Sequence, residues 1–128
     1  NFFDKIYSIA VLHHIPSNEL RLNFFQDAKR VLKPNGLLII VAWKFKRWQE
    51  RLLLLKYNIF KLFGKSKMDR NDLFLPWQKK ILRYYHFFSE TELKNLAREA
   101  GFEIIKSGVI SNERGNRNNI YLICQKSS

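Results

Sequence analysis

The fold of this chain is decided by residues 2–43, which read FFDKIYSIAVLHHIPSNELRLNFFQDAKRVLKPNGLLIIVAW. Residues 2–12 form a nearly continuous apolar run after a charged start, which is typical of a parallel strand buried on both faces. Residues 16–33 repeat apolar side chains every three or four positions, which predicts a helix. Residues 37–43 are a second, fully apolar strand. Strand, helix and strand in this order predict a right-handed βαβ unit with parallel strands.

The helix between these strands has a predicted start and a predicted buried face. Ser17 is a residue type whose side chain accepts hydrogen bonds from the free backbone N–H groups of a first turn, so it is the candidate N-cap. Leu20, Phe24, Ala28 and Val31 follow at helical spacing. We expect these four side chains to face the core.

The rest of the chain contains an insertion and a second pair of strands. Residues 47–63 place basic residues between apolar side chains at helical spacing, which predicts an amphipathic helix. Residues 89–101 open with a serine–glutamate capping box and end on glycine, which predicts another helix. Residues 102–110 and 119–125 are strands joined by an asparagine-rich loop, so we expect them to pair antiparallel. The fold class is therefore α/β, with parallel strands, an inserted basic amphipathic helix and an antiparallel final pair.

The net charge of +12 is concentrated in one part of the chain. From Lys44 to Arg83, twelve lysines and arginines stand against three acidic residues, a net charge of about +9. Clustered cations of this kind attract polyanions such as RNA, although the same composition also suits a solvated basic surface. We expect residues 44–88 to form a substrate-side insertion that contacts nucleic acid.

Composition limits the class of protein and its chemistry. Cys124 is the single cysteine, so no internal disulfide can form, and a reducing compartment such as the cytoplasm is expected. No apolar stretch reaches the roughly 18 residues that span a bilayer, although the helix at residues 47–63 could lie on a membrane surface or pack as a lid. Three histidines and one cysteine lack the spacing of metal ligands, so no metal is expected.

The glycines are not arranged as in a nucleotide-binding loop. The chain has five of them, and no two are close enough in sequence to cradle a phosphate or an adenosine: Gly36, Gly64, Gly101, Gly108 and Gly115. The first strand would also be an unpaired hydrophobic edge. We therefore expect residues 1–128 to be part of a domain whose cofactor-loop half lies outside them.

Several stretches resemble a known family. Residues 3–15 (FDKIYSIAVLHHI) and 30–36 (RVLKPNG) look like the fourth strand and the turn before the fifth strand of a class I S-adenosylmethionine-dependent methyltransferase. Residues 72–77 (DLFLPW), 83–88 (RYYHFF) and 117–121 (RNNIY) are similar to the tRNA wobble-uridine carboxymethyl methyltransferases. That family includes the methyltransferase domain fused to an AlkB-like oxygenase. The resemblance implies the C-terminal half of a Rossmann-like class I methyltransferase sheet.

The resemblance also implies a cofactor, a substrate and site residues. S-adenosylmethionine would be the cofactor, bordered by residues at the carboxyl end of the first strand, where α/β sheets bind ligands: Ile9, Ala10, Val11 and His13. The acceptor would be the carboxylate of a carboxymethyl uridine in tRNA, and the catalytic candidates suited to hold it are His14, Arg83, Tyr85 and His86. The candidates for RNA contacts are Trp77, Lys79, Lys80, Arg117 and Asn119. A small activating partner protein is implied as well.

Alternatives stay open for single residues. Tyr84 and Tyr85 would face opposite ways in an extended segment, so one of them could belong to the core. His86 could be a structural histidine, and Trp77 could pack the insertion onto the sheet instead of stacking on a base.

Alternatives stay open for the substrate too. Asn118 and Ile120 depart from the acid and the tryptophan that are usual in the resembling family. The chain could therefore serve a methyltransferase of small metabolites, quinones or lipids, or be an RNA-binding module without cofactor affinity.

Overall fold

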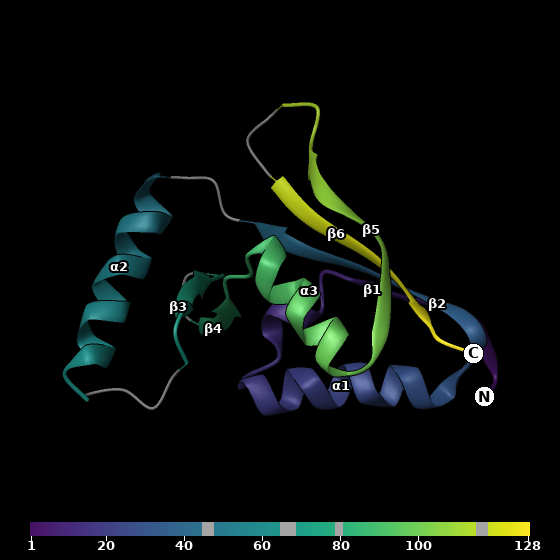
Figure 1. The fold of residues 1–128 in the computed structure, drawn as a ribbon. Helices are drawn as coiled ribbons and strands as arrows, with labels where there is room; N and C mark the ends of the chain where they lie inside the picture. Colours follow the sequence, from purple (N-terminus) through teal and green to yellow (C-terminus); the bar gives the residue numbers. More distant parts are fainter. Residues whose placement is uncertain (45–47, 65–68, 79–80, 115–117) are drawn as a thin grey trace.

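The computed structural model describes residues 1–44, 48–64, 69–78, 81–114 and 118–128. The strands are β1 (Phe3–Ile9), β2 (Leu32–Lys44), β3 (Asp72–Trp77), β4 (Ile81–His86), β5 (Phe102–Ser111) and β6 (Asn118–Lys126). The helices are the 3-10 turn η1 (Leu12–His14), α1 (Asn18–Val31), α2 (Trp48–Leu62) and α3 (Glu90–Glu99). In Figure 1, α1 and α3 lie against a four-stranded sheet, and α2 stands at one end of the molecule beside the small β3–β4 sheet.

The four-stranded sheet has the order β1, β2, β6, β5. β1 and β2 are parallel, with Ile6 beside Leu38 and Ile9 beside Val41. β6 runs antiparallel to both β2 and β5. The α/β fold class, the parallel first pair and the antiparallel final pair are thereby confirmed.

One face of this sheet carries the hydrophobic core. Side chains from alternate strand positions meet apolar side chains of α1 and α3, and they include Phe25, Ala28, Leu38, Ile40, Ala42, Leu93, Leu96, Ala97, Ile120, Leu122 and Cys124. The core therefore joins both halves of the sheet to the same pair of helices. Burial in this cluster raises the pKa of the Cys124 thiol to about 12, so this cysteine stays protonated and unreactive at neutral pH.

The opposite face of the sheet is open among the described residues. Tyr7 and Ile9 point to that side, since Ile6 and Ser8 alternate with them toward the core, and they are 64% and 56% exposed. No strand of the described residues pairs with the outer edge of β1. The expected unpaired hydrophobic edge is present.

The start of α1 is as predicted, but its buried face is only partly so: Ala28 is buried and Phe24 packs against the core. The Ser17 hydroxyl accepts a hydrogen bond from the Leu20 backbone N–H at 3.3 Å, which confirms the N-cap. The residues buried on α1 are Arg21, Phe25 and Ala28, whereas Leu20 is 48% exposed. The inward face is therefore shifted by one residue at the start of the helix, because the Arg21 side chain has buried polar partners there.

Residues 30–36 do not form a free turn before β2. The strand already begins at Leu32, and Asn35 has a φ of 63° within it. A Cβ on Gly36 would lie 2.9 Å from the Lys33 carbonyl oxygen, so this position requires glycine for lack of space.

Residues 44–88 contain the predicted basic helix and a sheet that we did not predict. α2 confirms the helix, and its side chains Leu52, Leu55, Ile59 and Leu62 are exposed. No described helix is both long enough and apolar enough to cross a membrane. β3 and β4 form a separate antiparallel hairpin.

Candidate active site

The carboxyl ends of β1 and β2 bring together residues that are 30 positions apart in the sequence. His13 and His14 form η1 directly after β1, and Trp43 lies near the end of β2. Parallel strands place their carboxyl ends at the same edge of a sheet, where open α/β sheets bind their ligands. Tyr85 reaches this edge from β4 of the hairpin.

These four side chains pack as an aromatic cluster of His13, His14, Trp43 and Tyr85. The rings of His13 and Trp43 are stacked with their centroids 4.7 Å apart, and the Trp43 and Tyr85 rings are stacked at 5.5 Å. His14 is tilted against both His13 at 4.3 Å and Tyr85 at 4.8 Å. The cluster joins the sheet edge to the hairpin.

His13 is neutral and accepts a hydrogen bond within this cluster. Its ring is fully buried, and the Trp43 backbone N–H donates to His13 Nδ1 at 3.4 Å. Burial, and after it the charge that His14 can carry, lower the pKa of His13 to about 4. Nδ1 accepts a hydrogen bond, so the proton of the neutral ring is on Nε2. Nε2 is buried and has no hydrogen-bond partner in the described part of the chain.

His14 fixes the hairpin to the sheet edge through the backbone. Its Nδ1 lies 3.2 Å from the Tyr84 carbonyl oxygen, and a carbonyl can only accept, so Nδ1 donates. The ring is only partly buried. His14 is therefore both tethered to β4 and accessible at the carboxyl edge.

The two faces of the β3–β4 hairpin have different chemistry. Asp72 pairs with His86, Phe74 with Tyr84, and these side chains share one face because strand positions alternate. Tyr85 and Arg83 occupy the other face of β4. Tyr84 and Tyr85 thus face opposite ways, as predicted: the Tyr84 hydroxyl accepts from Arg21 at 2.5 Å, while Tyr85 joins the aromatic cluster.

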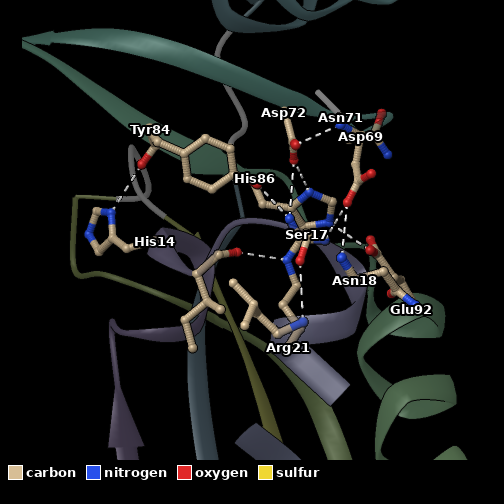
Figure 2. A network of polar contacts seen from close by, with 12 residues as sticks. His14, Ser17, Asn18, Arg21, Asp69, Asn71, Asp72, Tyr84, His86 and Glu92 are labelled. Atoms are coloured by element: carbon tan, nitrogen blue, oxygen red, sulfur yellow. Dashed lines mark hydrogen bonds and ion pairs between the residues drawn. The ribbon is translucent and has the colours of Figure 1, made fainter. Parts of the chain in front are cut away.

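The first face holds a polar network that centres on Arg21 and Asp72 (Figure 2). Arg21 is 1% exposed, and its guanidinium donates to the Ile15 carbonyl, to Asp72 Oδ1 at 3.2 Å and to the Tyr84 hydroxyl. Asp72 Oδ2 accepts from the Asp69 backbone N–H at 2.9 Å. Because the Arg21 guanidinium and the Asp72 carboxylate both have hydrogen-bond partners, burying their charges costs less free energy than burying unpaired charges would. The network also connects the hairpin to α1.

His86 belongs to this network and not to the carboxyl edge. Its Nδ1 lies 2.5 Å from Asp72 Oδ1 and its Nε2 lies 2.6 Å from Glu92 Oε1, so both ring nitrogens are engaged. Burial alone would lower the pKa of His86, but the hydrogen bonds to the two carboxylates outweigh it and raise the pKa above its usual value. The catalytic candidate His86 therefore has no nitrogen left for a substrate and acts in holding the hairpin to α3.

Arg83 and Trp77 form a pair on the second face. The Arg83 Cζ atom lies over the Trp77 ring, 3.9 Å from its centroid, which is a close cation–π contact. Trp77 is 38% exposed and Arg83 is partly buried. This pair lies on the same side of the hairpin as Tyr85.

A comparison with known protein families identifies the family of this chain. The profile of a family described as a methyltransferase domain matches residues 1–107. The chain belongs to the methyltransferase domain family.

Relatives of this methyltransferase domain include two tRNA enzymes and one archaeal structure. The tRNA (carboxymethyluridine(34)-5-O)-methyltransferase of Schizosaccharomyces pombe is 26% identical over 99% of this chain and 58% of its own length. The Arabidopsis thaliana protein of the same name is 36% identical over 41% of this chain and 13% of its own length. The crystal structure of a SAM-dependent methyltransferase from Methanosarcina mazei, 24% identical, covers 98% of this chain and 59% of that chain with a TM-score of 0.74.

These figures mean that the chain spans little more than half the length of the fission-yeast relative and of the archaeal structure. The archaeal match supports the fold, including the Rossmann-like sheet that the resemblance implied.

The remaining predicted residues of the methyltransferase domain lie in three places. Ile9 ends β1, and Ala10 and Val11 follow it; the Ala10 backbone N–H donates to the Val41 carbonyl, and Ala10 has a φ of 56°. Asn119 lies on β6 directly opposite Trp43. The predicted RNA-binding residues Lys79, Lys80 and Arg117 lie outside the described residues.

No group of three His, Cys, Asp or Glu side chains that could hold a metal ion occurs in the described part of the chain, which is residues 1–44, 48–64, 69–78, 81–114 and 118–128. Ile120, which replaces the usual tryptophan, is fully buried in the core and lies opposite Ala42.

Two important residues of the site were missed from the sequence. Trp43 has no signal of its own, because it ends an apolar strand and reads as core. Arg21 is a charged residue in a helix and reads as a solvated position, although its partner Asp72 is 51 residues away.

Proposed function

We propose that this methyltransferase domain takes part in methyl transfer from S-adenosylmethionine to the carboxylate of a 5-carboxymethyl uridine at the wobble position of tRNA. The observation that carries the proposal is the similarity to the fission-yeast tRNA (carboxymethyluridine(34)-5-O)-methyltransferase over 99% of this chain. The activity is that of a whole protein, since the chain spans 58% of that relative's length.

The carboxyl edge of β1 offers groups that fit the cofactor. Ile9 and Val11 expose 56% and 45% of their surface there, and exposed apolar side chains suit a purine ring. The His13 Nε2–H is a buried donor without a partner among the described residues, and such a donor is costly until an acceptor reaches it. We assign Ile9, Ala10, Val11 and His13 to the border of the cofactor. When bound, S-adenosylmethionine supplies an electrophilic methyl group on a sulfonium.

The acceptor in this proposal needs orientation and not deprotonation. A carboxylic acid with a pKa of about 4 is ionised at neutral pH, so no general base is required. Arg83 supplies a planar cation for the carboxylate, and it shares a face of the hairpin with Tyr85. His14 and Tyr85, in contact with each other, would exclude water from the acceptor and hold it in line for attack. We assign Arg83, His14 and Tyr85 to the acceptor and His86 to the support of the hairpin.

The insertion provides the contact with tRNA. Lys44 to Arg83 carries most of the positive charge of the chain, and the hairpin within it reaches the carboxyl edge through Tyr85. Phosphates of a folded RNA are attracted to such a surface over distances of about 10 Å at moderate salt. We assign Lys79 and Lys80 of the insertion, together with Arg117 and Asn119 from outside it, to the contact with tRNA.

The proposal is tested with the full-length protein, S-adenosylmethionine and tRNA that carries 5-carboxymethyl uridine. Nucleosides from digested tRNA are quantified by mass spectrometry, and tRNA with an unmodified wobble uridine is the control. We expect the methyl ester only from the modified tRNA, at a rate that stays flat from about pH 6 to pH 9, because the nucleophile is already ionised.

Two results would contradict the proposal. A rate that climbs tenfold per pH unit over this range would indicate a protonated nucleophile such as a hydroxyl or an amine. If the protein methylated a small metabolite and did not methylate the modified tRNA, the domain would belong to a small-molecule methyltransferase.

A further inference from the structure

The Arg83 guanidinium lies over the Trp77 ring on one face of the hairpin. Trp77 ends β3 opposite Ile81, and Arg83 lies two positions further along β4, so both side chains project from the same face of the hairpin. The Arg83 Cζ atom is 3.9 Å from the Trp77 ring centroid, so the guanidinium is in contact with the indole face. The tryptophan therefore limits the orientations that this arginine can adopt.

The hydrogen-bond donors of Arg83 are unused in the described structure. No side-chain hydrogen bond or ion pair connects Arg83 to another residue of the described ranges, whereas the Arg21 side chain donates to Ile15, Asp72 and Tyr84. A guanidinium that contacts a ring through its flat face keeps its N–H groups directed outward in its own plane. Arg83 is thereby set to bind two oxygens of one anion.

The acidic residues near the hairpin do not neutralise Arg83. Asp72 lies on the opposite face of the hairpin, where it is engaged by Arg21 and His86. Glu92 is engaged by His86 as well. The positive charge of Arg83 is thus available on the face where Tyr85 meets the aromatic cluster.

We propose that Trp77 and Arg83 form one preassembled oxyanion receptor for the RNA substrate. Trp77 is its positioning residue, which orders the guanidinium before the ligand arrives, and Arg83 binds the oxygens. A receptor ordered in advance loses less conformational entropy on binding than a free arginine side chain. The inference rests on the proposed function for the identity of the substrate as RNA. The oxyanion is either the carboxylate of the modified base or a backbone phosphate, which share the same geometry of two oxygens.

The test uses the full-length protein and measures RNA binding without any methyl transfer. Two anticodon stem-loops of one sequence are compared by fluorescence anisotropy, one with 5-carboxymethyl uridine and one with its neutral methyl ester. The variants are Trp77→Leu, Trp77→Phe, Arg83→Lys and the double variant Trp77→Leu with Arg83→Lys. Phe74→Leu, an aromatic of the same strand on the other hairpin face, and Arg98→Lys, an exposed arginine on α3 outside the insertion, are the matched controls.

We expect Trp77→Leu and Arg83→Lys each to weaken binding about five- to tenfold, as for the loss of a partly desolvated cation–π contact or a two-pronged hydrogen bond. The double variant should bind no more weakly than Arg83→Lys alone, because the two residues act as a unit. Trp77→Phe keeps an aromatic face and should retain most of the affinity, and it provides a second test of the aromatic contact if Trp77→Leu does not fold. The two controls should leave the affinity unchanged.

The two stem-loops distinguish the sources of the anion. A loss confined to the carboxymethyl RNA assigns the receptor to the carboxylate. An equal loss on both RNAs assigns it to a phosphate, which both stem-loops share. Either result supports the receptor.

Three other results would overturn the receptor. Additive losses in the double variant would mean that Trp77 contacts the RNA independently, as a platform for a base. Unchanged affinity in both folded single variants, or no RNA binding by the wild-type protein, would remove its role altogether.

Coupling between the two residues in a protein that does not methylate the modified tRNA would leave the receptor standing and refute only the proposed function. Methylation without coupling would refute only the receptor.

Discussion

Asp72 and His86 lie directly opposite each other on β3 and β4, with 2.5 Å between Asp72 Oδ1 and His86 Nδ1. Both side chains are 2% exposed. The pair closes the base of the hairpin and connects it to Arg21 on α1 and to Glu92 on α3. The position of Tyr85 and Arg83 on the other face of the hairpin depends on this connection.

Removal of the Asp72 charge is expected to destabilise the protein strongly. Asp72→Asn leaves the buried Arg21 and His86 without their shared anion, and breaking a buried pair of this kind costs about 3–5 kcal/mol. Urea unfolding of the full-length protein measures the change. Asp27→Asn is the control, because Asp27 and Arg30 form an exposed pair that contributes at most about 1 kcal/mol. Equal stability of the two variants would show that the network is not needed for the fold.

The stability of the protein is expected to decline on the alkaline side of pH 6.5. The folded state holds the pKa of His86 above its usual value of 6.5, so folded His86 keeps its proton where unfolded His86 has lost it. The stability from this group is complete below pH 6.5 and is lost as the pH rises through the raised pKa. Unfolding curves at a series of pH values measure the decline. In His86→Gln it should be absent; an equal decline there would assign the effect to another group.

His13 should give the opposite dependence on the acid side. Its pKa falls from 6.5 to about 4 on folding, so the unfolded chain binds a proton in this range and the folded chain does not. The stability that comes from the neutral ring is present above pH 6.5 and is lost as the pH falls toward 4. The full loss is about 3 kcal/mol by the pKa difference. His13→Phe keeps a ring against Trp43 and should flatten this part of the profile, as measured by thermal or urea unfolding. A profile unchanged by the substitution would contradict the assignment.

The sequence predicted the helices and the main sheet because these depend on local patterns. Ser89 caps α3 by accepting from the Glu92 backbone N–H at 3.1 Å, as the capping box predicts. In a complete capping box the Glu92 carboxylate would also accept from the Ser89 backbone N–H. Here the Glu92 carboxylate binds His86 instead. That exchange depends on a contact between β4 and α3, which no local pattern contains.

The β3–β4 hairpin and the roles of its residues could not be predicted in the same way. Pro76 inside β3 argues from the sequence against a strand in the middle of a sheet, yet a two-stranded hairpin tolerates proline where no neighbour needs its N–H. Once the register is known, Asp72 falls opposite His86 and explains why this histidine is structural. Arg21 was missed because its partners are distant in sequence, and an isolated arginine carries no sign of burial.

Replacement of Lys79 and Lys80 by alanine should reduce the salt dependence of tRNA binding. Each phosphate contact on a duplex region contributes a slope of about −0.9 to log K against log salt concentration, so the loss of two contacts should lower its magnitude by about 1.8. Affinity for the cofactor should stay the same. Lys33→Ala is the control, because Lys33 pairs with Asp4 at the amino end of β2. An unchanged slope in the double variant would assign these two lysines to a solvated surface.

The free edge of β1 has a consequence for handling these 128 residues in the laboratory. No described strand pairs with that edge, and the exposed Tyr7 and Ile9 side chains lie on the open face beside it. Unpaired backbone groups next to apolar side chains are a template on which a strand of another copy can add. A preparation of this segment alone would therefore self-associate as its concentration rises, and crystallisation or calorimetry would report on aggregates. Self-association through the free edge of β1 would therefore limit the concentration at which this segment can be studied.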